Sequence, residues 1–370
     1  MGPTHQRTKT ARRSRGLFAF LLVTVAAAIV ASSVSASATS PRKHEAVPKG
    51  FNKAGDILVT DQFNNRVLEI NPKTQKIVWS FGTGSAFAGS TTVIAPNDAE
   101  RIPGGRTLIA GTGVPAGTKG YPPAGAIDNR VFIVNAQKKI VWQYGVGGLT
   151  GNRPNQLNTP VSAVYLPNGH VLITDQGNQR VIEVNKAKKI VWQYGTTSVT
   201  GSGANHLDTP NSAELLPNGH ILIADETNNR VIEVTRAKKI VWQYGSPDDA
   251  DSILHGAAFA SRLPSGNTLI SDSANNRIIE VNMSKHVVFN YPTNKQPGSL
   301  AGPNPTRAVQ LTNGSILITN QFDNQILIVN RAKSIVYRYG KIGVVGKAHG
   351  FLNGPYSAYV IGDYTGLTRP

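Results

Sequence analysis

A few side chains in this 370-residue chain could support acid–base chemistry. His255 could act as a general base or as a metal ligand, and Arg307 and Asp98 could balance charge beside it. His206 and His349 stand in comparable places before two other predicted strands. A single histidine without a defined partner set seldom marks a site. His255 is therefore a candidate catalytic residue, without an assigned reaction.

Aspartate and arginine also recur as pairs five residues apart. A residue that a reaction needs once should not return at the same position of every repeat. An aspartate that caps a turn, and an arginine that bridges backbone groups, should return each time. We therefore interpret the pairs as structural; they are Asp61/Arg66, Asp175/Arg180, Asp225/Arg230 and Asp272/Arg277.

Motifs for metal or cofactor binding are absent from the sequence. It contains no histidine pattern of a zinc site, no Gly-x-Ser-x-Gly elbow and no phosphate-binding loop. Asp248, Asp249 and Asp251 could hold Ca²⁺, but they lack EF-hand spacing and a solvated acidic loop explains them. We expect no metal and no cofactor; a cation such as Ca²⁺ in a channel has no support in the sequence.

A repeat organises the rest of the chain. The motif Ile-Val-Trp-Gln-Tyr-Gly occurs at 140–145, 190–195 and 240–245, and diverged copies begin at Ile77, Val287 and Ile335. Within the copy at 160–194, turn-forming residues separate four short β-rich runs. One such unit cannot bury both of its faces, so the copies must stack around an axis. The sequence predicts an all-β protein, a six-bladed β-propeller of four-stranded antiparallel blades.

The two ends of the chain predict how the ring closes. The first copy has little room for an innermost strand before residues 56–60. An extra segment at 354–360 resembles the innermost strands that begin at Pro160 and Pro210. We expect this C-terminal strand to complete the first blade and so remove an open edge.

The innermost strands carry a variable column of side chains toward the predicted axial channel. Asp98 and Arg307 are its only charges, and they could either neutralise each other in a polar, water-filled channel or bind a small ligand or cation at the channel mouth. The predicted ligand-binding residues are Asn97, Asp98, Ser162, Asn211, Ser212, Arg307, Tyr356 and Ser357.

Basic residues fill the turns between the third and fourth strands, and these turns contain no acid. The propeller should gather them on one face, either to keep the hairpins soluble or to bind an anionic partner. The residues expected to matter most are Lys138, Lys139, Lys188, Lys189, Lys238 and Lys239.

The repeats resemble those of NHL-repeat propellers. A leucine before a proline and a later Asp-x-x-Asn-x-Arg carry the resemblance, as Leu157, Pro160, Asp175, Asn178 and Arg180 in one copy. The Lys-Ile-Val-Trp-Gln-Tyr-Gly ending is also similar to PQQ-binding-like and arylsulfotransferase-type propeller repeats. These resemblances imply a propeller fold that hosts binding modules, lyases or sulfotransferases, and the fold does not choose among them.

The first 38 residues are typical of an export signal. Five basic residues and no acid precede an apolar run at 17–31, and Ala36-Ser37-Ala38 is a small-x-small cleavage pattern. We expect a signal peptide at 1–38, a linker at 39–49 and the propeller at 50–370; an uncleaved anchor and twin-arginine export are alternatives. Cleavage would leave 33 basic against 21 acidic residues, a net charge of about +12. No cysteine is present, so stability must come from burial.

These observations predict a secreted or cell-envelope protein, monomeric and without a transmembrane span once mature, that acts in binding, sensing or scaffolding. Its partner would be an anionic envelope polymer, a glycan, a small molecule or a protein, and export makes nucleic acid an improbable one. The alternative is a secreted propeller enzyme, a lyase, lactonase or arylsulfotransferase-like protein, with its site at the channel mouth.

Overall fold

The structure, a computed structural model, describes residues 46–248, 253–365, 367 and 369. The expected signal peptide and most of the expected linker lie outside these residues, as do Asp249 and Asp251. The segment Glu45–Pro370 forms one compact unit.

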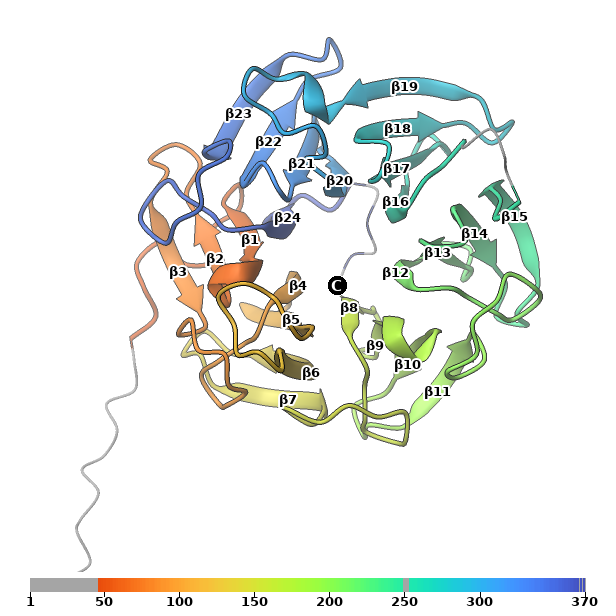
Figure 1. Cartoon of the computed structure of the whole chain (residues 1–370), viewed down its shortest axis with the longest axis horizontal. Coiled ribbons are helices and arrows are strands. Elements are labelled where there is room, and N and C mark those ends of the chain that lie inside the picture. The colour runs from red at the N-terminus through yellow and green to blue at the C-terminus, as the bar shows by residue number, and fades with distance from the viewer. Residues whose placement is uncertain (1–45, 249–252, 366, 368, 370) are drawn as a thin grey trace, which may run out of the picture. The chain divides into compact units, whose positions relative to one another are not determined.

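Six four-stranded antiparallel sheets form this unit, arranged as blades around an axis (Figure 1). From the inside outward, blade 1 comprises β24 (Pro355–Val360), β1 (Ile57–Asp61), β2 (Arg66–Ile70) and β3 (Ile77–Phe81). Blade 2 comprises β4 (Pro96–Ile102), β5 (Arg106–Val114), β6 (Ala126–Val134) and β7 (Ile140–Gly145). Blade 3 comprises β8 (Pro160–Tyr165), β9 (Val171–Asp175), β10 (Arg180–Val184) and β11 (Ile190–Tyr194).

The remaining blades follow the same plan. Blade 4 comprises β12 (Pro210–Leu215), β13 (Ile221–Asp225), β14 (Arg230–Val234) and β15 (Ile240–Gly245). Blade 5 comprises β16 (Ala257–Arg262), β17 (Thr268–Asp272), β18 (Arg277–Val281) and β19 (Val287–Pro292). Blade 6 comprises β20 (Pro305–Gln310), β21 (Ile316–Asn320), β22 (Gln325–Val329) and β23 (Ile335–Gly340). The helices in the described residues are three single 3₁₀ turns, η1 (Gln62–Asn64), η2 (Gln176–Asn178) and η3 (Thr293–Lys295). The predicted six-bladed propeller is confirmed.

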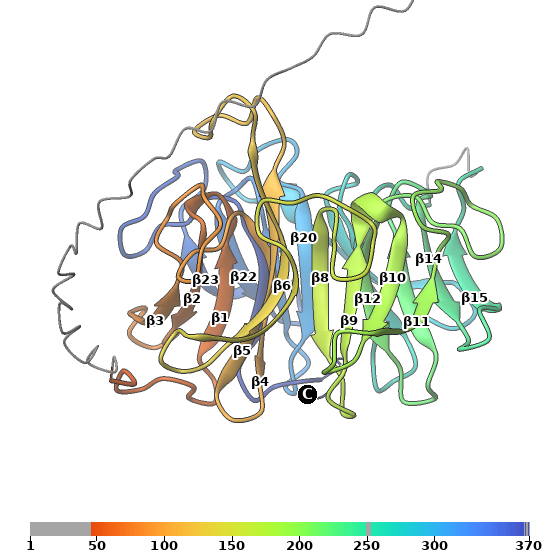
Figure 2. The same cartoon turned by 90° about the horizontal axis from the view of Figure 1, so that it is seen from below.

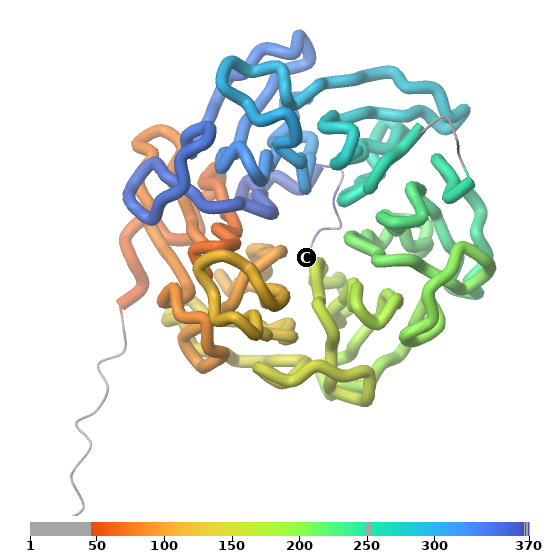
Figure 3. The backbone as a smooth tube through the Cα atoms, viewed as in Figure 1, coloured from red at the N-terminus to blue at the C-terminus, as the bar shows by residue number. Residues whose placement is uncertain are grey.

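The C-terminal strand closes the ring, as the sequence predicts. β24 pairs antiparallel with β1, with Ile57 opposite Val360 and Val59 opposite Ala358. Blade 1 therefore combines the first strand of the propeller with its last, and the tube in Figure 3 shows the blue end of the chain beside the red one.

The blades expose two different faces. In each blade, one face carries the turn between the third and fourth strands and, in blades 2 to 6, also the turn between the first and second; we call it the turn face. The opposite face, the loop face, carries the turn between the second and third strands and the longer connection to the next blade. Figure 2 shows the propeller from the side, with the two faces at opposite ends of the strands.

The hydrophobic core lies between neighbouring blades. One cluster joins Leu108 and Val131 of blade 2 to Ile173 and Ile182 of blade 3, and five similar clusters follow around the ring. Trp142 packs against this first cluster, and its indole nitrogen donates to the Lys186 carbonyl of the next blade at 3.2 Å. Large aromatic residues on the outer strands therefore fill the widening gaps between blades.

The repeated Asp/Arg pairs hold each blade to the loop before it. Asp175 accepts the Arg180 guanidinium at 2.8 Å through one oxygen and the Asn158 backbone NH at 2.8 Å through the other. The pairs of blades 1, 4 and 5 do the same. In blade 6, where the pair is replaced by Asn320 and Gln325, Asp323 accepts the Leu300 NH. These contacts support the structural interpretation of the pairs.

The Gly/Pro-rich insertion of blade 2 lengthens β5 and β6 into a hairpin above the loop face, drawn in gold at the top of Figure 2. Its Tyr121 hydroxyl lies 2.6 Å from Asn65 Oδ1 in blade 1. The insertion thus packs against the neighbouring blade.

Candidate functional site

An ion pair crosses the middle of the channel. Arg307 on β20 and Asp98 on β4 come from blades 6 and 2, and Arg307 Nη2 lies 3.1 Å from Asp98 Oδ1. Tyr359 on β24, between them, accepts a hydrogen bond from Arg307 Nη1 and donates one to Asp98 at 3.3 Å. The guanidinium also lies 4.5 Å from the ring centroid of Phe259. Both charges are buried, and each neutralises the other inside the channel.

The predicted channel serines bond to protein groups. Ser162 donates to the other carboxylate oxygen of Asp98 at 3.1 Å, and Ser212 accepts the Ala260 NH at 3.3 Å. Ser357 lies against Thr60, 3.4 Å between the hydroxyl oxygens. All three are buried. Ser162 and Ser212 therefore link neighbouring inner strands, whereas Ser357 contacts the second strand of its own blade.

Amide side chains form hydrogen bonds at the loop-face end of the inner strands. Asn211 donates to Glu226 at 2.7 Å and lies beside the Tyr356 hydroxyl, which comes from the blade opposite. Gln62 bonds to Asn97 at 2.7 Å on the same level. Burial raises the pKa of Glu226, and the Asn211 hydrogen bond partly offsets this.

Two carboxylic acids line the channel toward the turn face. Glu100 on β4 accepts the Tyr165 NH at 2.8 Å, and Glu214 on β12 accepts the Arg262 NH at 3.1 Å. Burial raises the pKa of Glu214 to about 8. Burial, together with the negative charge of Asp98, raises the pKa of Glu100 well above its usual value. Burial therefore favours the uncharged form of both side chains, which suits a lumen that holds a cavity of about 20 Å³.

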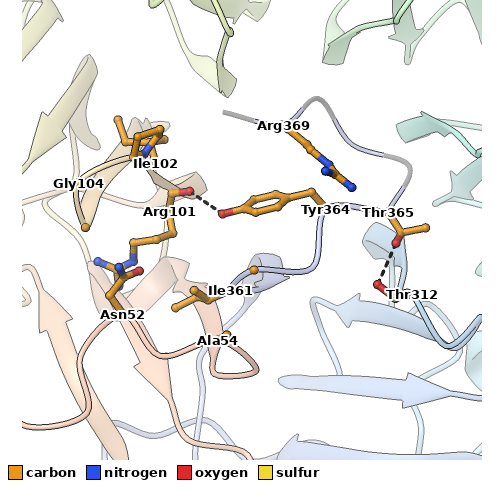
Figure 4. Close-up of a pocket in the computed structure, with 13 residues that line it drawn as sticks. Asn52, Ala54, Arg101, Ile102, Gly104, Thr312, Ile361, Tyr364, Thr365 and Arg369 are labelled. Carbon is orange, nitrogen blue, oxygen red and sulfur yellow. Dashed lines mark hydrogen bonds between the residues drawn. The ribbon is translucent and has the colours of Figure 1, made fainter.

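The chain that follows β24 crosses the turn-face mouth of the channel. Tyr364 donates to the Arg101 carbonyl at 3.2 Å, and Thr365 lies 3.2 Å from Thr312 between the hydroxyl oxygens (Figure 4). Leu367 then packs against Phe259, Val309 and Tyr359 in the lumen; we call residues 361–365, 367 and 369 the tail.

Two larger cavities flank the tail. The first, of about 600 Å³, lies beside blades 1, 2 and 6 and is lined by Arg101, Tyr364 and Arg369 among others (Figure 4). The second, of about 730 Å³, lies beside blades 3, 4 and 5, with Leu215, Leu263 and Leu367 as apolar lining and Glu214, Arg262 and Arg369 as polar lining. These cavities and the lumen meet at the tail, so the turn-face mouth is the hollowed part of the channel.

The basic turns surround this mouth, because they lie on the same face. Arg236 and Arg331 are engaged: Arg236 pairs with Glu183 at 2.5 Å and Arg331 pairs with Glu280 at 2.6 Å. Five of the six lysines singled out from the sequence are exposed and Lys138 is half-buried; the exposed ones are Lys139, Lys188, Lys189, Lys238 and Lys239.

The histidine candidate lies away from the channel charges. His255 is exposed on the loop face; its backbone NH donates to Asp272, and its carbonyl accepts from the backbone NH of Ala274. Arg307 and Asp98 are bonded to each other inside the channel. The described residues contain no group of three or more His, Cys, Asp or Glu side chains that could hold a metal ion. His255 remains a prediction from the sequence.

Sequence reasoning missed Glu100, Glu214, Tyr359 and the tail. The inner strands begin with a bulge, after which side chains alternate, so Glu100 follows Asp98 on the same side of β4. An acid two residues after a predicted channel residue was the available signal. Leu367 follows the last strand and has no counterpart in other repeats, so no repeat pattern could place it.

Comparison with known proteins identifies the fold and leaves the family open. No family model and no curated protein matches the sequence. A protein of unknown function from Bacteroides caccae is 14% identical, with a TM-score of 0.55 over 77% of this chain and 93% of that chain. A chain of a nidogen/laminin complex is 10% identical, with a TM-score of 0.52 over 82% and 97%. Virginiamycin B lyase from Staphylococcus aureus is 14% identical, with a TM-score of 0.48 over 81% and 88%. At these identities the likeness concerns the fold alone.

Proposed function

We propose that this protein is an exported, non-enzymatic binding propeller that holds an anionic polymer of the cell envelope against its turn face. The observation that carries this proposal is a lysine that recurs where the backbone does not favour it. Lys138, Lys188, Lys238, Lys285 and Lys333 all have φ between 61° and 68°, in the turns between the third and fourth strands.

This conformation argues against a purely structural reason for the lysines. A positive φ favours glycine, and a side chain costs about 1 kcal/mol there. Solubility alone would be served by a lysine elsewhere in the same turn. The recurrence in five of six blades therefore supports a role for the charge itself.

The arrangement suits a repeating polyanion better than a single small anion. Each turn sits on a different blade, so the charges are spread around the face and each would meet a different repeat of the polymer. Exposed charges act over about 10 Å at 0.1 M salt and about 3 Å at 1 M. Binding should therefore be cumulative, weak per site and sensitive to salt.

Retention on an immobilised polyanion tests this role. We would load the protein on a glycerol-phosphate polymer and on poly-glutamate, and elute with a NaCl gradient. Replacing Lys138, Lys139, Lys188, Lys189, Lys238 and Lys239 by glutamate should abolish retention on both. If the wild-type protein is retained on the phosphate polymer and not on poly-glutamate, the turn face binds phosphate specifically. Retention that survives both the six substitutions and 1 M NaCl would refute the proposal.

A second variant separates charge from folding. Lys138→Gly, Lys188→Gly and Lys238→Gly together relieve three positive-φ side chains, while glycine adds freedom to the unfolded chain; the two effects oppose each other, so the free energy of unfolding should change by less than about 1 kcal/mol in total. Earlier elution with an unchanged melting temperature is the expected result. The matched control is Val191→Thr on the exposed outer strand β11, which should elute like the wild type.

Export is part of the proposal, supported by the basic and apolar pattern of residues 1–38. Expression of the full chain, cell fractionation and N-terminal sequencing test it. We expect the mature protein outside the cytoplasm and beginning at Thr39. Cytoplasmic protein that keeps Met1 would contradict this part of the proposal.

We also propose that the chain is a divergent relative of the NHL-repeat propellers. The Asp-x-x-Asn-x-Arg motif supports this, because Asn178 and Arg180 both bond to Asp175 and the same arrangement recurs at Asp225.

A screen for lyase, lactonase and sulfotransferase turnover tests the non-enzymatic role. Turnover that is lost in His255→Ala would overturn that role and favour the enzyme alternative.

A further inference from the structure

The tail is held at the turn-face mouth by hydrogen bonds to two blades and by one within itself. Asp363 accepts the Thr312 backbone NH at 2.9 Å in blade 6, and Tyr364 bonds to the Arg101 carbonyl in blade 2. Leu367 NH donates back to the Tyr364 carbonyl at 3.0 Å, which turns the chain toward the axis. The tail therefore adopts a defined path over the mouth.

Leu367 occupies the part of the lumen that a ligand would enter. Its neighbours Phe259, Val309 and Tyr359 provide apolar and aromatic surface, and Glu214 and Arg307 line the same cavity. About 20 Å³ remains free beneath it, room for roughly one water molecule. The leucine thus acts as the anchor that fills the lumen.

The space at the turn-face mouth is larger than the volume that the tail fills. Cavities of about 600 Å³ and 730 Å³ remain on its two sides. Arg307, which is buried, and Arg262, which is half-buried, line this region, and the Nε atom of each is buried with no hydrogen-bond partner in the described part of the chain. A buried donor without an acceptor costs about 1–3 kcal/mol, so the groove is suited to a ligand that supplies acceptors.

We infer that the turn-face mouth is a peptide-binding groove, and that the tail occupies it in place of an extended segment of another polypeptide. The occupant has a tyrosine whose hydroxyl donates to the Arg101 carbonyl, a branched aliphatic residue three positions later in the lumen, and backbone carbonyls available as acceptors. The tail supplies this pattern as Tyr364 and Leu367. The inference rests on the tail and the lumen and is independent of the basic turns.

A tail that is attached to the propeller competes strongly with a free peptide. A short linker gives an effective concentration in the millimolar range. The full chain should therefore bind an outside segment weakly until the tail is displaced. Removing the tail should reveal the groove without disturbing β24, because the Ile361 and Asp363 contacts lie before the cut.

The experiment uses the full chain and a variant that ends at Asp363. The probe is a fluorescein-labelled peptide of residues 361–370, and binding is followed by anisotropy in 0.5 M NaCl, where the basic turns are screened. We expect saturable binding to the shortened protein and at least tenfold weaker binding to the full chain. A peptide with Leu367→Ala should bind the shortened protein at least tenfold more weakly.

Two further variants keep the inference falsifiable. Val164→Trp fills the lumen of the shortened protein from the opposite wall and should abolish binding while leaving the circular dichroism spectrum unchanged. If the shortened protein fails to fold, Leu367→Asp in the full chain replaces it in the anisotropy titration, because a charged side chain should leave the apolar part of the lumen. The inference is wrong if a folded protein without Leu367 in its lumen does not bind the peptide at 1 mM, or binds the Leu367→Ala peptide equally well. The tail would then serve only to stabilise the propeller.

Discussion

The Tyr356 hydroxyl on β24 donates a hydrogen bond to Asn211 Oδ1 on β12, at 3.1 Å, across the axis of the propeller. The two residues belong to blades 1 and 4, which face each other in a ring of six. This bond and the Arg307–Asp98 pair below it tie inner strands together across the channel at two levels.

Removing the Tyr356 hydroxyl should destabilise the fold. Tyr356→Phe leaves the buried Asn211 amide short of one partner, and we expect a loss of about 1–3 kcal/mol in the free energy of unfolding measured with urea. Tyr337→Phe is the matched control, because the Tyr337 hydroxyl is buried without a partner in the described structure and its loss should be neutral or slightly stabilising. Equal effects of the two changes would contradict the role of the cross-channel bond.

Breaking the buried ion pair should cost more. Asp98→Asn leaves Arg307 charged and buried without its counterion, and we expect a loss of about 3–5 kcal/mol in the free energy of unfolding. Adding Arg307→Met should recover part of this loss. Arg236→Gln, which removes a half-exposed partner of Glu183, should cost less than about 1 kcal/mol in the same assay. A small effect of Asp98→Asn, with no recovery in the double variant, would argue against mutual neutralisation.

Glu214 should make stability depend on pH. Its folded pKa of about 8 lies above the ordinary value of 4.5, so the folded protein keeps a proton that the unfolded chain releases between these values. The free energy of unfolding should therefore fall as pH rises from about 4.5 to 8, by an amount on the order of a few kcal/mol for this residue. Urea titrations of Glu214→Gln should show a flatter profile that meets the wild-type curve near pH 4.5. Parallel curves for the two proteins would mean that Glu214 is not the group involved.

Deleting residues 354–370 should open the ring. This cut removes β24 and exposes the β1 edge, whose backbone groups then lack partners. We expect a lower melting temperature and self-association by light scattering. The protein that ends at Asp363 is the control, since it keeps β24 and should stay monomeric. A 354–370 deletion that remains monomeric with an unchanged melting temperature would show that β24 is dispensable.

The sequence predicted the blades well because each blade repeats the same physical problem. Trp142, Trp192 and Trp242 mark equivalent outer strands, and Pro355 could be matched to Pro160 because an orphan inner strand has only one place to pair. Mutual neutralisation of Asp98 and Arg307 was one of two interpretations of the only charges in the predicted channel column; the other was a binding site for a small ligand or cation. Repetition therefore gave strands, order and closure.

The lumen and the tail could not be predicted in the same way, because both depend on departures from the repeat. Glu214 becomes a neutral acid only through burial on all sides, which a one-dimensional pattern does not report. Leu367 reaches the lumen because the last strand of blade 1 ends at the turn-face mouth of the channel, and the residues that it contacts there come from different blades. A residue that lies outside the repeats has no equivalent residue in another repeat from which its position could be predicted.

Joining β1 and β24 in one blade also dictates when the protein can finish folding. Thr60 and Ser357 touch although 297 residues separate them, so a chain that emerges from a ribosome or a translocon in sequence order carries an unfinished ring until its final strand appears. Such long-range closure is slow, and until it occurs the β1 edge of blade 1 stays open although the other five blades are complete. A circular permutant that links 360 to 57 through a short turn and opens the chain between β7 and β8, the last strand of blade 2 and the first of blade 3, would turn this closure into a local hairpin and should refold faster than the natural order.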